Sequence, residues 1–265
     1  MSLIENHFNL HTAPFPQAAD PSAVLQHASL KEAIEKLHFS LDRDGIALLS
    51  AESGCGKSTA LGCLNRALDP TKHLILYSSM ASLGPFGLIS SLAVKLGLRS
   101  RKSKGQAVHD LITHLRGLTR RTVIIIDEAH LLPDSSLEDL RLLTADSFEK
   151  KSPLTLILAG QPLLRERMNE PQHCALMQRI TVRIGLRPLT EKDLALFIDM
   201  HMRTCGAQRS LFDSEAIALL FQHSRGIPRP AQSLALNAML AAVAANKKTI
   251  DPQCVHTALL EQEAP

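Results

Sequence analysis

One short stretch constrains this chain more than any other: Ala51–Ser58, with the sequence Ala-Glu-Ser-Gly-Cys-Gly-Lys-Ser. The apolar run Gly45–Ser50 precedes it, and the helix-forming segment Thr59–Leu64 follows it. A buried strand, a glycine-rich turn and a helix in this order are the setting of a phosphate-binding loop of the pattern G-x-x-x-x-G-K-[ST]. The first position here is alanine rather than glycine. The alternative interpretation is a glycine turn with an incidental Lys-Ser pair.

The residue types in this loop suit an anion. Gly54 and Gly56 permit backbone angles that a Cβ atom disfavours, so successive N–H groups can curl around a phosphate. Lys57 can reach the β and γ phosphates, and the Ser58 hydroxyl can bind Mg²⁺, while the helix points the positive end of its dipole at the charge. The residues predicted to contact the bound nucleotide here are Ser53, Gly54, Cys55, Gly56, Lys57, Ser58 and Thr59.

The rest of the chain alternates apolar strands with helical patterns. Strands are predicted at 46–50, 73–77, 122–126, 154–159 and 180–184, with helices at 29–37, 86–98 and 107–118 between or before them. Short β-branched strands with helical connections predict an α/β fold with a parallel sheet covered by helices on both faces. Residues 7–16 are predicted to be an extended arm with turns, because the prolines disfavour helix.

The character of the chain changes at Leu189, after which only helical segments follow. These are predicted at 193–205, 213–224, 230–245 and 252–262. We therefore expect an arm and first helix over 1–44 that belong to the core, an α/β core over 45–188, and a helical lid over 189–265.

The third predicted strand ends in Asp127-Glu128-Ala129-His130. An apolar strand that ends in two acids is the partner that a phosphate loop requires. Asp127 is predicted to hold Mg²⁺ through its water shell, and Glu128 to polarise the attacking water. The alternative is a solvated acidic turn. His130 is equally compatible with a helix start and with a functional role.

The fourth predicted strand ends in Gly160-Gln161-Pro162. A polar amide at this tip is expected to lie between the ends of the second and third strands, near the γ-phosphate, so Gln161 is a candidate catalytic residue that senses hydrolysis. The alternative is a turn residue that precedes a proline.

Three arginines are candidates for contacts with the phosphates. Arg179 lies just before the fifth strand, where it could reach a neighbouring subunit, and an arginine supplied in this way stabilises the charge on the transferring phosphate. Arg183 is the competing candidate for that role. Arg229 opens a lid helix and could contact the phosphates of its own chain. For each, the alternative is an ordinary surface or ion-paired arginine.

These motifs together resemble the AAA+ family, and within it the ExeA-like branch. The residues that carry the resemblance are His7-Phe8, Pro14–Pro16, Ala51–Ser58, Ile125–His130, Ala159–Pro162, Gln178–Ile180 and Gly226–Arg229. The resemblance implies a P-loop ATPase core with a helical lid, ATP bound at subunit interfaces, and assembly into rings or helical filaments. The branch divides between membrane-anchored secretion ATPases and transposition regulators of the TnsC/TniB type. This chain shows neither the transmembrane segment nor the wall-binding extension of the secretion type, so it looks more like the transposition regulators.

Charge is distributed unevenly along the chain. The formal net charge is only +3, but residues 95–121 hold eight basic side chains against one acid. Arg99, Arg101, Lys102 and Lys104 form the predicted DNA-binding loop, because such a loop suits backbone phosphates and gives salt-sensitive binding. In similar transposition ATPases the DNA-facing surface lies in the comparable region. The alternative is a solvated basic loop.

We therefore expect an ATP hydrolase that forms homo-oligomers on duplex DNA and recruits a transposase, with a target-selection protein as a further partner. A cytoplasmic location without a membrane partner is expected, because the chain shows no apolar span and no export signal core. The five cysteines include no C-x-x-C pair, which favours reduced thiols. The alternatives are an ATPase that energises a secretion or membrane-associated assembly, and a replication-initiator or clamp-loader-like ATPase.

Overall fold

The computed structural model describes residues 3–16, 24–43, 45–79, 85–99, 101–144, 152 and 154–263. The chain forms two compact units. One consists of residues 29–186, and the other joins residues 1–28 to residues 187–265.

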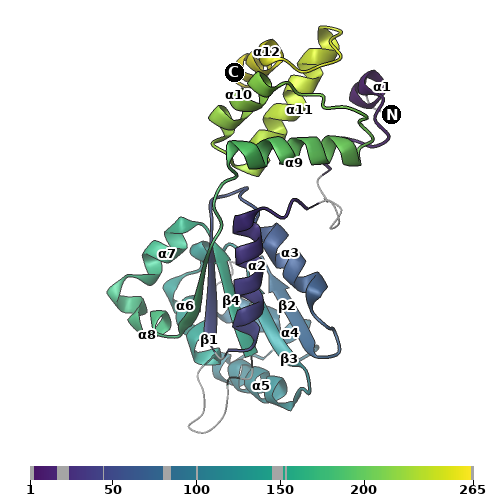
Figure 1. Ribbon diagram of the computed structural model, residues 1–265. Helices are drawn as coiled ribbons and strands as arrows, with labels where there is room; N and C mark the ends of the chain where they lie inside the picture. Colours follow the sequence, from purple (N-terminus) through teal and green to yellow (C-terminus); the bar gives the residue numbers. More distant parts are fainter. Residues whose placement is uncertain are drawn as a thin grey trace. The chain divides into compact units, whose positions relative to one another are not determined.

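A parallel sheet forms the centre of the first unit (Figure 1). Its strands are β1 (Gly45–Ser50), β2 (His73–Ser78), β3 (Arg121–Ile126), β4 (Leu154–Gly160) and β5 (Ile180–Gly185). They lie in the order β2-β3-β4-β1-β5, and each neighbouring pair is parallel. This confirms the predicted parallel sheet. The carboxyl ends of all five strands therefore meet at one edge, which is where parallel sheets bind ligands.

Helices cover both faces of this sheet. The elements are α2 (Ala28–Leu41), α3 (Lys57–Ala67), α4 (Pro85–Lys95), α5 (Lys104–Gly117), η2 (Ala129–Leu131), α6 (Asp134–Leu143), α7 (Pro162–Met168), η3 (Pro171–His173) and α8 (Cys174–Met177). Apolar residues of α4, α5, α6, α7 and α8 form one buried cluster with alternate residues of β1, β3 and β4. Figure 1 shows α2 and α3 on the opposite face.

Burial along the strands follows from their places in the sheet. Every residue of β4 is buried, because this strand lies between β3 and β1 and has helices on both faces. In β5 buried and exposed residues alternate, as expected for a strand at the edge of a sheet. Its exposed positions are Thr181, Arg183 and Gly185.

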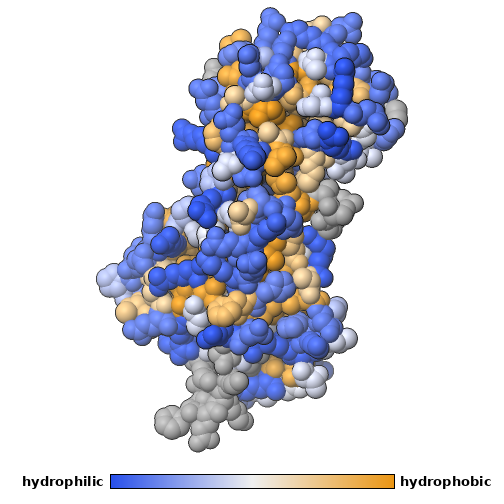
Figure 2. Space-filling view, in the orientation of Figure 1, coloured by the Kyte–Doolittle hydropathy of each residue, from blue (hydrophilic) through white to orange (hydrophobic). Residues whose placement is uncertain are grey.

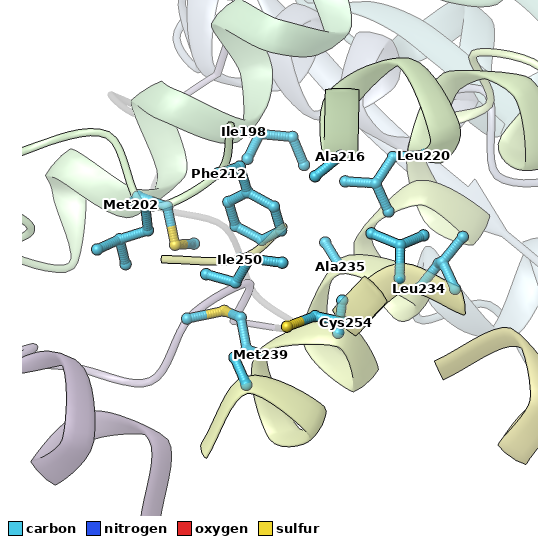
Figure 3. Close-up of a cluster of buried hydrophobic side chains, with 14 of the residues drawn as sticks. Ile198, Met202, Phe212, Ala216, Leu220, Leu234, Ala235, Met239, Ile250 and Cys254 are labelled. Atoms are coloured by element: carbon cyan, nitrogen blue, oxygen red, sulfur yellow. The ribbon is translucent and has the colours of Figure 1, made fainter. Parts of the chain in front are cut away.

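The second unit is helical and contains α1 (Leu3–Phe8), α9 (Glu191–Thr204), α10 (Ser214–Ser224), α11 (Pro228–Ala244) and α12 (Pro252–Glu263). These helices enclose a separate apolar core, and Figure 3 shows part of it, with Phe212 and Met239 among the side chains. Figure 2 shows hydrophobic side chains at the surface of this unit where α9 runs, and Leu196 in that helix is 51% exposed. The C-terminal helices predicted from the sequence are thus present as a packed unit.

The N-terminal residues differ from the sequence-based expectation in two ways. Residues 3–8 form the helix α1 rather than an extended arm, because Ile4 and Phe8 lie one turn apart and both enter the core of the helical unit. His7 reinforces this contact, since its Nε2 lies 2.8 Å from the carbonyl oxygen of Lys247. Residues 1–28 therefore group with the lid, and not with the α/β core to which 1–44 were assigned.

The described residues contain no helix that is both long enough and apolar enough to cross a bilayer.

Candidate phosphate-binding site

The glycine-rich loop follows β1 directly and leads into α3. Its start is fixed by the N–H of Ala51, which donates to the carbonyl oxygen of Gly160 at the end of β4 (3.1 Å). Gly54 and Gly56 have φ angles of 80° and 102°. Both lie in the left-handed region, which glycine adopts at little cost. Both glycines therefore adopt backbone angles that a Cβ atom disfavours, as the sequence analysis predicted for a loop that curls around a phosphate.

Lys57 is buried although it carries a charge, with only 6% of its surface exposed. Its Nζ atom donates to the carbonyl oxygens of Ala51 (2.9 Å) and Glu52 (3.3 Å). These bonds hold the ammonium group inside the curl of the loop. A buried cation requires such partners, and it gives the loop a fixed positive charge.

The first turn of the helix after the loop has no feature that opposes an anion. Helix α3 begins at Lys57, the N-cap residue Gly56 has no side chain that could accept from the first N–H groups, and the first turn contains no acid. The dipole and the free N–H groups of this turn thus favour negative charge. Burial, with a contribution from Glu52, raises the pKa of the Cys55 thiol, so the sulfur stays neutral. The residues present fit a bound phosphate chain.

Asp127 lies at the end of β3 and is 5% exposed. Both oxygens of its carboxylate are hydrogen-bonded: the Tyr77 hydroxyl donates to Oδ2 (2.8 Å), and the N–H of Glu128 donates to Oδ1 (2.9 Å). Tyr77 is a residue that the sequence analysis missed. Partial burial, and then the bond to Asp127, raise the pKa of Tyr77 to about 12, so the hydroxyl remains a donor at neutral pH.

Glu128 has a backbone conformation that is unusual for its residue type. Its φ is 54° and its ψ is 34°, in the left-handed region. Its side chain is 39% exposed. Strained conformations of this kind cluster at functional sites, where the surrounding structure holds them. The turn after β3 therefore leaves the Glu128 side chain partly accessible at the carboxyl edge of the sheet.

Gln161 follows β4 and begins α7. The expectation that it lies between the ends of the second and third strands was wrong. Strand β4 lies between β3 and β1, and β2 is at the far side of β3. Sequence order does not determine strand order in a sheet of crossover connections. The corrected position puts Gln161 between Asp127 and the loop, so the structure brings all three to the same edge.

Oxygen ligands for Mg²⁺ are available at this edge. Ser58 is exposed in the first turn of α3, and Asp127 supplies a carboxylate. Mg²⁺ prefers oxygen ligands and keeps several waters, so one hydroxyl, one carboxylate and a phosphate suit it. Among the described residues His, Cys, Asp and Glu nowhere gather in a group of three that could hold a metal by themselves.

The two arginines near β5 differ in their freedom. Nη1 of Arg179 donates to the carbonyl oxygen of Thr144 at the C-terminal end of α6 (2.9 Å), and the side chain is half-buried. Arg183 is exposed on the edge strand, where Nη2 lies 3.4 Å from the sulfur of Met177. Arg183 is therefore the more accessible of the two. Arg229 belongs to the helical unit, where it is exposed in the first turn of α11.

The predicted DNA-binding residues separate into two pairs. Arg101 bonds Asp110 (2.6 Å), and Lys104 bonds the buried carboxylate of Asp139 (2.8 Å). Lys104 therefore ties α5 to α6, which the sequence analysis did not anticipate. Arg99 and Lys102 are exposed and have no ion-pair partner within the described part of the chain. Of the four predicted residues, Arg99 and Lys102 are therefore the two without an ion-pair partner among the residues that the structure describes.

The strand order, the loop and the acidic end of β3 define a P-loop nucleotide-binding fold. More particularly, residues 40–168, which lie in the first unit, match the family model of the AAA domain.

Two curated proteins resemble this chain in sequence. General secretion pathway protein A of Aeromonas hydrophila is 34% identical over 244 residues, which are 89% of this chain and 44% of that protein. Phosphate import ATP-binding protein PstB 2 of Bacillus licheniformis is 26% identical over 132 residues, which are 45% of this chain and 48% of that protein. The chain thus spans less than half the length of both relatives.

Solved structures share the fold at low sequence identity. Cdc6p from Pyrobaculum aerophilum has a TM-score of 0.70 at 16% identity, covering 92% of this chain and 71% of that chain. Drosophila ORC bound to DNA has a TM-score of 0.72 at 18% identity, covering 100% of this chain and 67% of that chain. These likenesses show the fold alone, and they extend over the helical unit as well as the sheet.

Proposed function

We propose that this protein binds and hydrolyses ATP at the loop after β1, and that the nucleotide state controls its assembly on duplex DNA. The observation that carries the first part is the buried ammonium of Lys57, held inside the loop at the sheet edge where Asp127 and Glu128 also lie. A fixed cation, free helical N–H groups and an accessible carboxylate are what phosphoryl transfer to water requires.

Each residue has a distinct task in this proposal. Lys57 and the N–H groups of the loop bind the phosphates, and Glu128 accepts a proton from the water that attacks the γ-phosphate. Gln161 contacts the γ-phosphate through its amide and reports its loss. Ser58 and Asp127 would hold Mg²⁺, which when bound offsets the negative charge of the phosphates. The Tyr77 hydroxyl keeps the Asp127 carboxylate oriented.

The assembly is proposed to be a homo-oligomeric ring or helical filament with nucleotide at each subunit interface. An arginine from one subunit would complete the site of the next, and Arg179 and Arg183 are the candidates. Arg183 is exposed on an edge strand, which suits contact with a neighbour. Arg179 would first have to leave the carbonyl oxygen of Thr144. Arg229 is proposed to contact the phosphates from the lid.

DNA binding is proposed to involve the segment before α5. Arg99 and Lys102 are the exposed cations without ion-pair partners in this segment, among the residues described. They suit contacts with a phosphate backbone that do not depend on base sequence. Lys104 and Arg101 serve mainly to position the segment through Asp139 and Asp110.

The biological role proposed on this basis is regulation of DNA transposition in the cytoplasm. The ATP-bound assembly would recruit or activate a transposase, together with a target-selection protein, and hydrolysis would release it. Support comes from the motif resemblance to transposition regulators and from the basic segment before α5.

A second candidate role is supported by a specific observation, namely the 34% identity to General secretion pathway protein A. In that case the ATPase would energise a secretion or membrane-associated assembly, and it would bind membranes or a membrane protein rather than DNA. Replication initiation is a further alternative, which the structures of Cdc6p and ORC support at the level of fold alone.

One experiment separates these roles. Binding to duplex DNA is measured at ~50 mM salt, where phosphate contacts are strong, with ATP, with ADP and without nucleotide, while light scattering follows particle size. ATP-dependent growth of particles on DNA is the expected result. Absence of DNA binding under all three conditions, together with sedimentation of the protein with membranes, would favour the secretion role instead.

The charge reversals Arg99→Glu and Lys102→Glu, made together, are expected to weaken DNA binding at least tenfold. Each lost phosphate contact should also reduce the slope of log affinity against log salt by about 0.9. The matched control is Lys31→Glu, a charge reversal of an exposed lysine on α2. Equal weakening by the control would show that net charge, rather than this segment, governs binding. Lys104 is not suitable for this test, because its loss leaves the buried Asp139 without its cation.

A further inference from the structure

His130 occupies a position that the sequence left open. It lies in η2, two residues after Glu128, and only 8% of it is exposed. Its Nδ1 atom lies 3.5 Å from Oε2 of Glu128, and the backbone N–H of Gln161 points to the same nitrogen from 3.5 Å. One ring nitrogen therefore stands between the candidate base and the residue at the tip of β4.

The surroundings hold this ring in place. Nη1 of Arg167 donates to the carbonyl oxygens of His130 (2.7 Å) and Leu132 (2.8 Å), which ties the turn to α7. Gly160 permits the close approach of β4, since a Cβ atom at that position would lie 3.2 Å from N and 3.3 Å from Nδ1 of His130. The position of the ring is thus determined by contacts on two sides.

The chemistry of imidazole makes the two contacts of Nδ1 mutually exclusive. When Nδ1 carries a lone pair, it accepts the N–H of Gln161 and has nothing to donate to Glu128. When Nδ1 carries a proton, it donates to the Glu128 carboxylate, and the N–H of Gln161 loses its acceptor. A hydrogen bond between Nδ1 and the N–H of Gln161 therefore excludes one between Nδ1 and the Glu128 carboxylate.

We propose that His130 is a positioning residue that couples the tip of β4 to the Glu128 carboxylate. With the N–H of Gln161 bound to Nδ1, the ring holds the turn after β3 against the tip of β4 and so keeps Glu128 facing the water that attacks ATP. When the tip of β4 moves away, the ring changes tautomer through solvent: Nε2 gives its proton to water and Nδ1 takes one from water. The new Nδ1–H then donates to the Glu128 carboxylate and holds it back. The inference rests on the proposed ATP hydrolysis and adds a link between the sensing residue and the base.

Replacement of His130 tests this link. His130→Ala is expected to lower kcat for ATP hydrolysis about tenfold or more, a part of the roughly 10²–10⁴-fold that a positioned base contributes. Affinity for a fluorescent ADP analogue should stay within about twofold, because the phosphate contacts are unchanged. His130→Asn places an amide near the position of Nδ1 and should restore much of kcat, whereas His130→Gln places it near Nε2 and should not.

A second comparison separates positioning from folding. In the Glu128→Gln background, His130→Ala should cause little further loss, because residues that act as a unit are not additive. The thermal midpoint of every variant is compared with that of His201→Ala, which removes a similarly buried histidine from the helical unit and should leave kcat unchanged.

The outcomes are distinguishable from failure of the proposed function. If the unmodified protein binds and hydrolyses ATP but His130→Ala has the same kcat, the coupling is refuted while the ATPase proposal stands. The same conclusion follows if Asn and Gln at position 130 behave alike, or if the losses from His130→Ala and Glu128→Gln simply add. If the unmodified protein fails to hydrolyse ATP, both proposals are overturned.

Discussion

Replacing Lys57 with alanine is expected to lower nucleotide affinity by about a hundredfold and to abolish measurable ATP hydrolysis. The reason is that Lys57 supplies the one buried cation of the loop, and its hydrogen bonds to Ala51 and Glu52 keep that charge inside the curl. A hydrogen bond from a charged group contributes about 1.5–3 kcal/mol, which corresponds to roughly ten- to a hundredfold in affinity. Loss of the phosphate contact therefore accounts for the expected change.

The measurement is titration with a fluorescent ADP analogue, followed by steady-state hydrolysis. Lys72→Ala is the matched control, because Lys72 lies in the turn before β2 and its side chain is 77% exposed. Both variants should melt as cooperatively as the unmodified protein. Unchanged ADP affinity in Lys57→Ala would mean that the loop does not bind phosphate as proposed.

Glu128→Gln should separate binding from hydrolysis. The substitution keeps the size of the side chain but removes its basicity, so kcat is expected to fall by about 10²–10⁴-fold while nucleotide still binds. Because ATP then persists, particles that assemble on DNA should dissociate more slowly than those of the unmodified protein. A longer lifetime of the particles on DNA would indicate that ATP hydrolysis regulates assembly, and does not serve mainly to form ADP and phosphate.

Single-turnover hydrolysis measures the rate of the chemical step in Glu128→Gln, and the decay of light scattering after dilution measures the dissociation of its particles from DNA. The matched control is Glu35→Gln on α2, which removes an exposed carboxylate far along the chain from β3. A Glu128→Gln variant that hydrolyses ATP at the normal rate would assign the base to another residue. Faster rather than slower dissociation would refute the role of hydrolysis as a release step.

Sequence patterns predicted those parts of the candidate site that are formed by residues adjacent in the chain. The loop Ala51–Ser58 needs two glycines and a lysine in sequence, and Asp127 and Glu128 need only the end of an apolar strand. The five strands were predictable for the same reason, since each is a short apolar run between helical patterns. Charge, backbone freedom and periodicity are properties of residues adjacent in the chain, so they can be recognised without knowledge of the fold.

Contacts between distant segments could not be predicted in this way. Tyr77 bonds Asp127 because β2 pairs with β3, and Lys104 bonds Asp139 because α5 and α6 pack on the same face. The position of Gln161 depended on the strand order, which sequence order does not determine. The helix α1 is short, and it forms where Ile4 and Phe8 find apolar partners in the helical unit.

The left-handed backbone conformation of Glu128 lowers the stability of the fold at a residue that ATP hydrolysis requires. A residue with a Cβ atom is disfavoured in that region by roughly 1–2 kcal/mol, and glycine is not. Glu128→Gly should therefore raise the thermal midpoint of the protein while it eliminates ATP hydrolysis, and a scanning-calorimetry trace beside an activity assay would show both. A lower midpoint would mean that contacts of the Glu128 side chain outweigh the strain. Selection for stability alone would favour glycine at this turn. Glu128 lowers the stability of the fold, and its role in ATP hydrolysis accounts for its presence.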